Sequence, residues 1–338
     1  MKVLLYFENE AMIKKSGIGR ALRHQKKCAE INGIEYTTNP RDSYDIAHVN
    51  TYYSRSYKLV KKLRKNNIPV IVHGHSTKED FRNSFRFWKI LQYPVNRRLK
   101  KIYSLPDMII TPTNYSKKLI EAYPFVSCPV RAISNGIELD KYQDPHLTKE
   151  EIIEVKANFG IKPEEKVIMG CGWFFERKGI LEFMETAKEF PNIKFIWFGE
   201  RMELLIPHNM NEAIRNKPEN VIFPGFVDSS FISKMLHISE CFFFPSYEET
   251  EGIVLLEALA SKCLPLIRDI GAFDYLTDKK DCIKAKDHTG FVEAIHYILT
   301  NDCEEMKENG YEIIQQRDIH VVARQLLETY EEVINSKK

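Results

Sequence analysis

The sequence lacks the cysteine spacing of a metal or redox site. Its seven cysteines are scattered, with no C-x-x-C pair, and several lie inside apolar runs typical of strands. We therefore expect buried thiols rather than disulfides or a zinc site. Long hydrophobic segments are missing too: no apolar run approaches the roughly 18 to 20 residues that span a bilayer, and MKVLLYFENE reaches Glu8 too soon for a signal peptide. These absences predict a cytoplasmic protein.

A large excess of charge of either sign is also missing, since 49 lysines and arginines stand against 47 aspartates and glutamates. The balance is uneven along the chain. The segment from Lys78 to Lys101 holds eight basic and two acidic residues, so it carries +6 and the rest of the chain −4. A local basic patch of this kind predicts an anionic surface as a partner.

Short apolar runs alternate with helical patterns along a chain that is long enough for two domains. This alternation predicts an α/β protein whose parallel sheets are covered by helices on both faces. The polar residues 140–151 separate two such series. We therefore predict two doubly wound domains that face each other across a cleft, residues 1–150 and 151–315. A final amphipathic helix in residues 316–338 is expected to pack back toward the first domain.

Two carboxylates eight positions apart, Glu249 and Glu257, flank the start of an apolar helix in PSYEETEGIVLLEALA. The preceding strand ends near Ser246 and the helix begins near Gly252. On that helix Glu257 lies on an almost entirely apolar face, and a buried carboxylate needs hydrogen-bond donors. The donors are either other groups of the protein or the hydroxyl groups of a ligand.

The same helix start is a candidate phosphate site, because Gly252 lets a phosphate approach the free N–H groups there, that of Ile253 included. The carboxylates of this loop would repel a phosphate unless cations lie opposite. In GWFFERKGI, Arg177 and Lys178 come directly before another helix, where positive charge opposes the helix dipole. A pyrophosphate between the two loops would resolve both conflicts, because its negative charge would pair with Arg177 and Lys178 and with the N–H groups near Gly252. The alternative is solvated surface charges, with the acidic residues merely favouring a helix N-terminus.

Two junctions in the first domain also carry candidate groups. KKSGIGRAL places Gly17 and Gly19 between strand and helix, but Leu22 stands where a dinucleotide fingerprint has its third glycine, so NAD is not expected. VIVHGHST ends a strand with His73 and His75 on the same side. Two histidines are too few for a metal site, and a structural role is the alternative to a functional one.

The stretch EETEGIVLLEALA resembles the E-x(7)-E motif of retaining glycosyltransferase family 4. ERKG after a strand resembles the basic diphosphate-binding pair of that family, and ISNGIEL resembles its Asn-Gly-Ile-Asp segment near the domain linker, with Glu138 in place of Asp. The resemblance covers essentially the whole chain. It implies the GT-B fold, in which two Rossmann-like domains face each other: here an acceptor and membrane domain followed by a nucleotide-sugar domain.

The resemblance also implies roles for the candidate residues. Glu257 would hold the ribose hydroxyls of the nucleotide, and Glu249 would contact the donor sugar near its reacting carbon. No metal or other cofactor is implied. The implied catalytic residues are His75, which matches a family His followed by small hydroxyl residues, and Glu249, Arg177 and Lys178, the last two stabilising the leaving diphosphate. The implied donor-binding residues are Gly17, Gly19, Arg177, Lys178, Glu249, Gly252, Ile253 and Glu257.

In the basic segment, bulky apolar residues interleave with cations, as in helices that lie on anionic membranes. Nucleic acid could use the same composition, and a helix packed on its own domain remains an alternative. A donor site beside such a patch favours a lipid acceptor, so an anionic membrane is expected and nucleic acid is not. The predicted membrane-binding residues are Arg82, Phe85, Arg86, Trp88, Lys89, Arg97 and Arg98.

ENEAMIKKSGIGRALRHQKK, HGHSTKEDFRNSF and PSYEETEGIVLLEALASK together make the chain similar to bacterial 1,2-diacylglycerol 3-glucosyltransferases. This resemblance implies retaining transfer of a hexose, glucose from UDP-glucose, to diacylglycerol. The enzyme would be cytoplasmic and peripheral on the inner face of the cell membrane. The residues leave two alternatives open: a glycosyltransferase of cell-surface polysaccharide or second-sugar glycolipid synthesis, and a sugar-nucleotide-binding protein without turnover.

Overall fold

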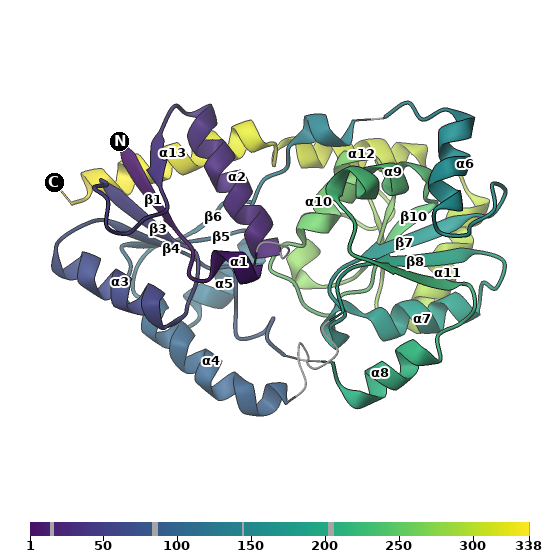
Figure 1. Ribbon diagram of the computed structural model, residues 1–338, viewed down its shortest axis with the longest axis horizontal. Helices are drawn as coiled ribbons and strands as arrows, with labels where there is room; N and C mark the ends of the chain where they lie inside the picture. Colours follow the sequence, from purple (N-terminus) through teal and green to yellow (C-terminus); the bar gives the residue numbers. More distant parts are fainter. Residues whose placement is uncertain (14–16, 83–86, 144, 202–205, 338) are drawn as a thin grey trace.

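The computed structural model describes residues 1–13, 17–82, 87–143, 145–201 and 206–337. Figure 1 shows two α/β units side by side, each built around its own sheet. Both sheets have six strands, and every pair of neighbouring strands is parallel. The predicted α/β class with two parallel sheets is confirmed.

The first sheet has the strand order β2-β1-β3-β4-β5-β6. Its central strands β3, β4 and β5 are buried along their whole length, as their apolar runs predict for a sheet covered on both faces. The strands are β1 (Lys2–Tyr6), β2 (Glu35–Thr37), β3 (Ile46–Val49), β4 (Val70–His73), β5 (Met108–Thr111) and β6 (Val130–Ala132). The helices are α1 (Glu10–Ile13), α2 (Gly17–Ile31), α3 (Ser54–Lys65), α4 (Trp88–Tyr103) and α5 (Asn114–Glu121).

The second sheet has the order β12-β11-β10-β7-β8-β9. Its strands are β7 (Val167–Cys171), β8 (Lys194–Phe198), β9 (Val221–Gly225), β10 (Cys241–Phe244), β11 (Pro265–Arg268) and β12 (Ile283–Ala285). Its helices are α6 (Lys149–Ala157), α7 (Ile180–Lys188), α8 (His208–Arg215), α9 (Ser229–Ile238), α10 (Ile253–Ala260), α11 (His288–Thr300) and α12 (Glu304–Gln315). Short 3-10 turns are η1 (Leu139–Tyr142), η2 (Glu176–Lys178) and η4 (Gly271–Phe273).

The last helix, α13 (Ile319–Asn335), belongs to the core of the first domain although it follows the second sheet. It packs against α2, and Figure 1 shows it lying along the first sheet. The main chain joins it to the linker, since the N–H of Ile319 donates to the carbonyl oxygen of Ile137 at 2.8 Å. The chain thus crosses between the domains twice, and the domain limits at residues 150 and 315 stay a prediction.

The cysteines and the apolar segments can be described in the structure. Five of the seven cysteines are buried, whereas Cys128 and Cys171 are partly exposed, and all seven are free thiols. Across the described ranges, no helix combines the length and the apolar character needed to cross a bilayer.

Candidate active site

The loop between β10 and α10, residues 245–252, lies where the two domains meet. Residues on the first domain's side bind it directly. The hydroxyl of Tyr115 donates to Oε1 of Glu248 at 2.8 Å. Glu251, only 1% exposed, accepts hydrogen bonds from the main-chain and side-chain N–H groups of Asn135 at 3.0 and 2.7 Å. The ISNGIEL segment therefore holds the acidic loop in place, a contact that the sequence did not reveal.

Glu249 faces the two predicted cations. Its Oε1 contacts Nζ of Lys178 and lies 3.7 Å from Nη1 of Arg177. Both cationic side chains are about 15% exposed or less, so the alternative of solvated surface charges is wrong. Burial alone would raise the pKa of Glu249, but the adjacent Lys178 and Arg177 outweigh it, and the pKa lies below its ordinary value. Burial lowers the pKa of Lys178. The cluster is a buried group of charges assembled from two strand-to-helix loops.

Two glycines allow these loops to come this close. Gly179 ends η2 at φ +76, and a Cβ there would lie 2.3 Å from the carbonyl oxygen of Pro245 in the acidic loop. Gly252 has φ +80 and precedes α10, and a Cβ would meet the ring of Phe244 at 3.0 Å. Both positions require the left-handed backbone that favours glycine. Gly252 and Ile253 thus begin α10 as predicted, with its first N–H groups at the junction.

Glu257 is fully buried, and the protein supplies hydrogen-bond donors to one of its two oxygens. The hydroxyl of Tyr142 donates to its Oε1 at 2.7 Å, and Nη1 of Arg20 contacts the same oxygen. Its other oxygen, Oε2, is buried and has no hydrogen-bond partner in the described part of the chain. Gly17 and Gly19 begin the helix α2 that carries Arg20, so the first-domain glycine loop leads to this carboxylate. One acceptor oxygen remains for a ligand.

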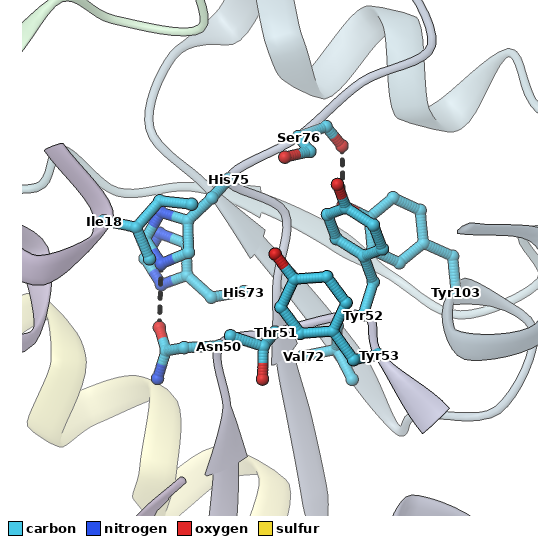
Figure 2. Close-up of a pocket in the computed structure, with 10 residues that line it drawn as sticks. All are labelled: Ile18, Asn50, Thr51, Tyr52, Tyr53, Val72, His73, His75, Ser76 and Tyr103. Atoms are coloured by element: carbon cyan, nitrogen blue, oxygen red, sulfur yellow. Dashed lines mark hydrogen bonds between the residues drawn. The ribbon is translucent and has the colours of Figure 1, made fainter. Parts of the chain in front are cut away.

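His73 and His75 lie face to face, as their spacing predicts, with ring centroids 3.9 Å apart and planes 9° apart. A third histidine, His48 at the end of β3, places Nε2 3.1 Å from Nδ1 of His73. Burial lowers the pKa of all three, to about 3 for His48 and for His75. The three rings are therefore neutral at ordinary pH. Figure 2 shows two of them beside Tyr52, Tyr53 and Tyr103 in a small cavity at the ends of β3 and β4.

The structure also links His75 to the acidic loop. Thr250, in the acidic loop, donates from its hydroxyl to the carbonyl oxygen of His75 at 3.4 Å. Candidates predicted from both halves of the chain thus meet at one place between the domains. No three His, Cys, Asp or Glu side chains gather in metal-binding geometry within the described ranges.

The predicted membrane-binding segment is only partly helical. α4 begins at Trp88, which is half-buried, and Lys89, Arg97 and Arg98 on α4 are exposed, as is Arg82 before it. Phe85 and Arg86 lie outside the described residues. The largest exposed apolar side chains of this region are instead Phe87, Ile90, Leu91 and Tyr93, of which Ile90 and Tyr93 are 72% and 75% exposed.

Comparison with known proteins identifies the family. Residues 37–141 match the family described as Glycosyltransferase Family 4, and residues 151–313 match Glycosyl transferases group 1. The whole chain is 48% identical to the processive diacylglycerol alpha-glucosyltransferase of Acholeplasma laidlawii, with all of both chains covered. The chain belongs to glycosyltransferase family 4. The resemblance read from its motifs is confirmed.

Other relatives of this family 4 glycosyltransferase include the alpha-galactosylglucosyldiacylglycerol synthase of Streptococcus pneumoniae. It is 24% identical over 78% of this chain and 70% of its own. Among solved structures, HepE of Anabaena in complex with UDP and glucose superimposes with a TM-score of 0.79, at 14% identity over 98% of this chain and 99% of that one. Sucrose-phosphate synthase from Thermosynechococcus elongatus gives 0.72 at 17% identity, over 98% and 81%. These similarities confirm the GT-B fold.

Several contacts at the site were not predicted from the sequence. Arg20 and Tyr142 contact Glu257 from distant parts of the chain, and Asn50 contacts His75. IAHVNT, the strand end that supplies Asn50, is a short run with few markers of a strand. The signal that could have identified this strand end is an apolar run followed by polar Asn-Thr, because VIVHGHST has the same arrangement of an apolar run and a polar end.

Proposed function

We propose that this glycosyltransferase transfers glucose from UDP-glucose to diacylglycerol with retention of configuration, forming an α-monoglucosyl diacylglycerol. The observation that carries the proposal is the 48% identity, over the full length of both chains, to a diacylglycerol alpha-glucosyltransferase. The site geometry supports it, because buried cations, an orphaned carboxylate oxygen and a helix N-terminus converge where the domains meet.

The residue roles follow from charge and position. Oε2 of Glu257 accepts the ribose hydroxyls, and Glu249 lies against the donor sugar near its reacting carbon. Arg177 and Lys178 neutralise the charge that grows on the diphosphate as the bond from the sugar to UDP breaks. The N–H groups at Gly252 and Ile253 share that charge.

The acceptor hydroxyl attacks from the face that UDP leaves. Its oxygen forms the new glycosidic bond while the bond from the anomeric carbon to the diphosphate breaks. A diphosphate oxygen takes the hydroxyl proton, so the products are UDP and the glycolipid. Gly17 and Gly19 lie against the donor phosphates, and His75 contacts the acceptor or the transferred glucose. The chain supplies the positive charge for this step from Arg177 and Lys178.

We further propose that α4 places the enzyme on the inner face of the cell membrane, as a peripheral protein. Two helices support this placement. α3, which packs beside α4, carries six cations and no acidic residue, and α4 carries five cations and none. At the start of α4 the exposed side chains of Phe87, Ile90 and Tyr93 can enter the headgroup region beside these charges. Nucleic acid is not proposed, because those apolar groups suit a lipid surface.

Incubation with UDP-glucose and vesicles containing diacylglycerol tests the proposal. We expect UDP and glucosyl diacylglycerol in equal amounts, the latter with an α-linkage by NMR. Lys178→Ala should lower kcat by about a hundredfold and the donor KM much less, because the diphosphate charge is largest in the transition state. UDP binding without any glycolipid would leave a sugar-nucleotide-binding protein, and an effect on KM alone would make Lys178 a ground-state binder.

Addition of a second glucose is the alternative that an observation favours, because the 48% identical relative is named processive. The two reactions differ in their product. Mass spectrometry of the lipid fraction during the first turnovers separates them: one-sugar lipid only, or two-sugar lipid that accumulates from the start.

A further inference from the structure

Two amides lie behind His75 and fix what its ring can do. Nε2 of His75 lies 2.8 Å from Oδ1 of Asn50. Asn50 in turn forms a paired hydrogen bond with Gln25 of α2, in which each amide donates to the oxygen of the other at 2.8 and 2.9 Å. Asn50 and Gln25 are 2% and 5% exposed, so water does not compete for these bonds.

The orientation of the Asn50 amide follows from a third contact. Its Nδ2 lies 3.4 Å from the main-chain carbonyl oxygen of His48, a group that can only accept. A flipped amide would bring two oxygens together there. Oδ1 therefore faces His75, and since Oδ1 only accepts, the His75 nitrogen next to it, Nε2, must carry the hydrogen.

We propose that Asn50 and Gln25 are positioning residues that hold His75 as the tautomer protonated on Nε2, which leaves Nδ1 as a hydrogen-bond acceptor for a hydroxyl group of the bound sugar or acceptor. Nδ1 of His75 has no partner within the described ranges. The role of the hydroxyl partner rests on the proposed function; the tautomer rests on the three contacts alone.

The stacked neighbours hold the ring plane. His73 covers one face of His75, and His48 binds His73 from behind. His48 is fixed by the hydroxyl of Tyr330 on α13, 2.8 Å from its Nδ1. The line from Tyr330 through His48 and His73 to His75 is buried, which keeps the imidazoles neutral. A neutral ring with a fixed tautomer offers one acceptor in one direction, and this suits the recognition of a single hydroxyl.

The tautomer can be measured without any assay of activity. In protein labelled with ¹⁵N histidine, the His75 signals are assigned by their loss in His75→Gln. We expect a slowly exchanging proton on Nε2 in the wild type and in Asn50→Asp, which keeps the acceptor oxygen, and its loss in Asn50→Leu. A proton on Nδ1 in the wild type would overturn the proposal. If the protein formed no glycolipid, the proposed function would be wrong, but the tautomer of His75 could still be measured and the proposal on Asn50 and Gln25 tested.

A double-mutant cycle tests whether the amides act through His75. In the wild-type background, Asn50→Leu should lower kcat roughly tenfold, because the His75 ring would no longer be held in position. In the His75→Ala background, the same substitution should lower kcat less than twofold. Asn32→Ala is the matched control, since Asn32 directly follows α2 and its side-chain amide donates to the main-chain carbonyl oxygen of Ala323 on α13 at 2.7 Å; it should leave kcat unchanged. Equal losses in both backgrounds would show a general structural role and overturn the proposal. If Asn50→Leu does not fold, Gln25→Leu is measured in the same cycle.

Discussion

Three glutamates of the acidic loop, Glu248, Glu249 and Glu251, are buried or partly buried in different environments, and these decide their chemistry. Burial raises the pKa of Glu251 and of Glu248, which bind groups of the first domain. Glu249 has its pKa lowered by the cations beside it, against the effect of burial. Of these three, only Glu249 has a pKa lowered by its neighbours, and it lies in the position proposed for the donor sugar.

The spacing of Glu249 and Glu257 was readable from the sequence because both lie within one strand-to-helix junction. The partners of Glu257 were not. Tyr142 is 115 positions away and arrives through the linker turn η1, and Arg20 arrives from the first domain. Local patterns report periodicity along the chain, whereas a side-chain contact between domains depends on how two sheets face each other.

Glu257→Gln tests whether the orphaned oxygen binds ribose. Hydrogen bonds to a charged acceptor contribute roughly 1.5 to 3 kcal/mol each, so we expect UDP to bind at least about tenfold more weakly in calorimetric titration. Tyr142→Phe is the matched variant, because it removes the protein donor to Oε1 and leaves Oε2 unchanged; it should alter the affinity little. Equal effects of the two substitutions in folded proteins would make Glu257 a structural clamp.

At the scale of elements, the ends of β3 and β4 bring three neutral histidines together, and one of them, His48, contacts Tyr330 of α13. The pattern VIVHGHST predicted β4 and the pairing of His73 with His75. β2 (EYT) and β3 (IAHV) were not predicted, because neither contains three consecutive apolar residues, whereas β4 (VIVH) and β5 (MIIT) begin with three. The position of His48 depends on β3 pairing with both β1 and β4, which local sequence does not encode.

The buried histidines His48, His73 and His75 predict that the stability of the fold depends on pH. The pKa values of His48 and His75 in the folded chain are about 3, below the ordinary value near 6.5, so between these pH values the unfolded chain binds protons that the folded chain does not. Stability is therefore complete above about pH 6.5 and falls as the pH decreases, by up to about 1.4 kcal/mol per pH unit for each histidine.

Urea unfolding at pH 7.0 and 5.5 measures this. The wild type should lose more stability between the two values than His48→Gln, by about 1 kcal/mol. His208→Gln, at an exposed position on α8, should keep the wild-type difference. An identical pH dependence in all three proteins would show that His48 is protonated in the folded state.

At the scale of the whole molecule, the two sheets and their order along the chain follow from alternating apolar runs and turn residues, and these could be predicted from the sequence. The location of charge was readable only in part. The segment 78–101 was found because its cations are consecutive, whereas the six cations of α3 became relevant only once α3 was seen to pack beside α4. Packing of helices that are separated in sequence depends on the sheet between them.

The basic face formed by α3 and α4 predicts that the first domain binds the membrane and that UDP binding does not depend on this face. Replacing Arg82, Lys89, Arg97 and Arg98 by Ser removes four exposed cations outside the donor site. Each contributes on the order of 1 kcal/mol near an anionic bilayer, so sedimentation with anionic vesicles should weaken by about a thousandfold at low salt while UDP affinity stays the same.

High salt distinguishes the apolar contribution to vesicle binding from the electrostatic one. Ile90→Ser with Tyr93→Ser should weaken vesicle binding even where salt has screened the cations, because burial of apolar area in the headgroup region does not depend on ionic strength. A charge-matched control with four exposed lysines of the second domain replaced, Lys188→Ser, Lys262→Ser, Lys280→Ser and Lys286→Ser, keeps the basic face intact and should bind vesicles normally. If this control weakened binding as much as the α4 variant, only net charge would matter. If the wild type ignored anionic lipid, the acceptor would have to reach the site from solution, and a soluble acceptor would replace diacylglycerol in the proposed reaction.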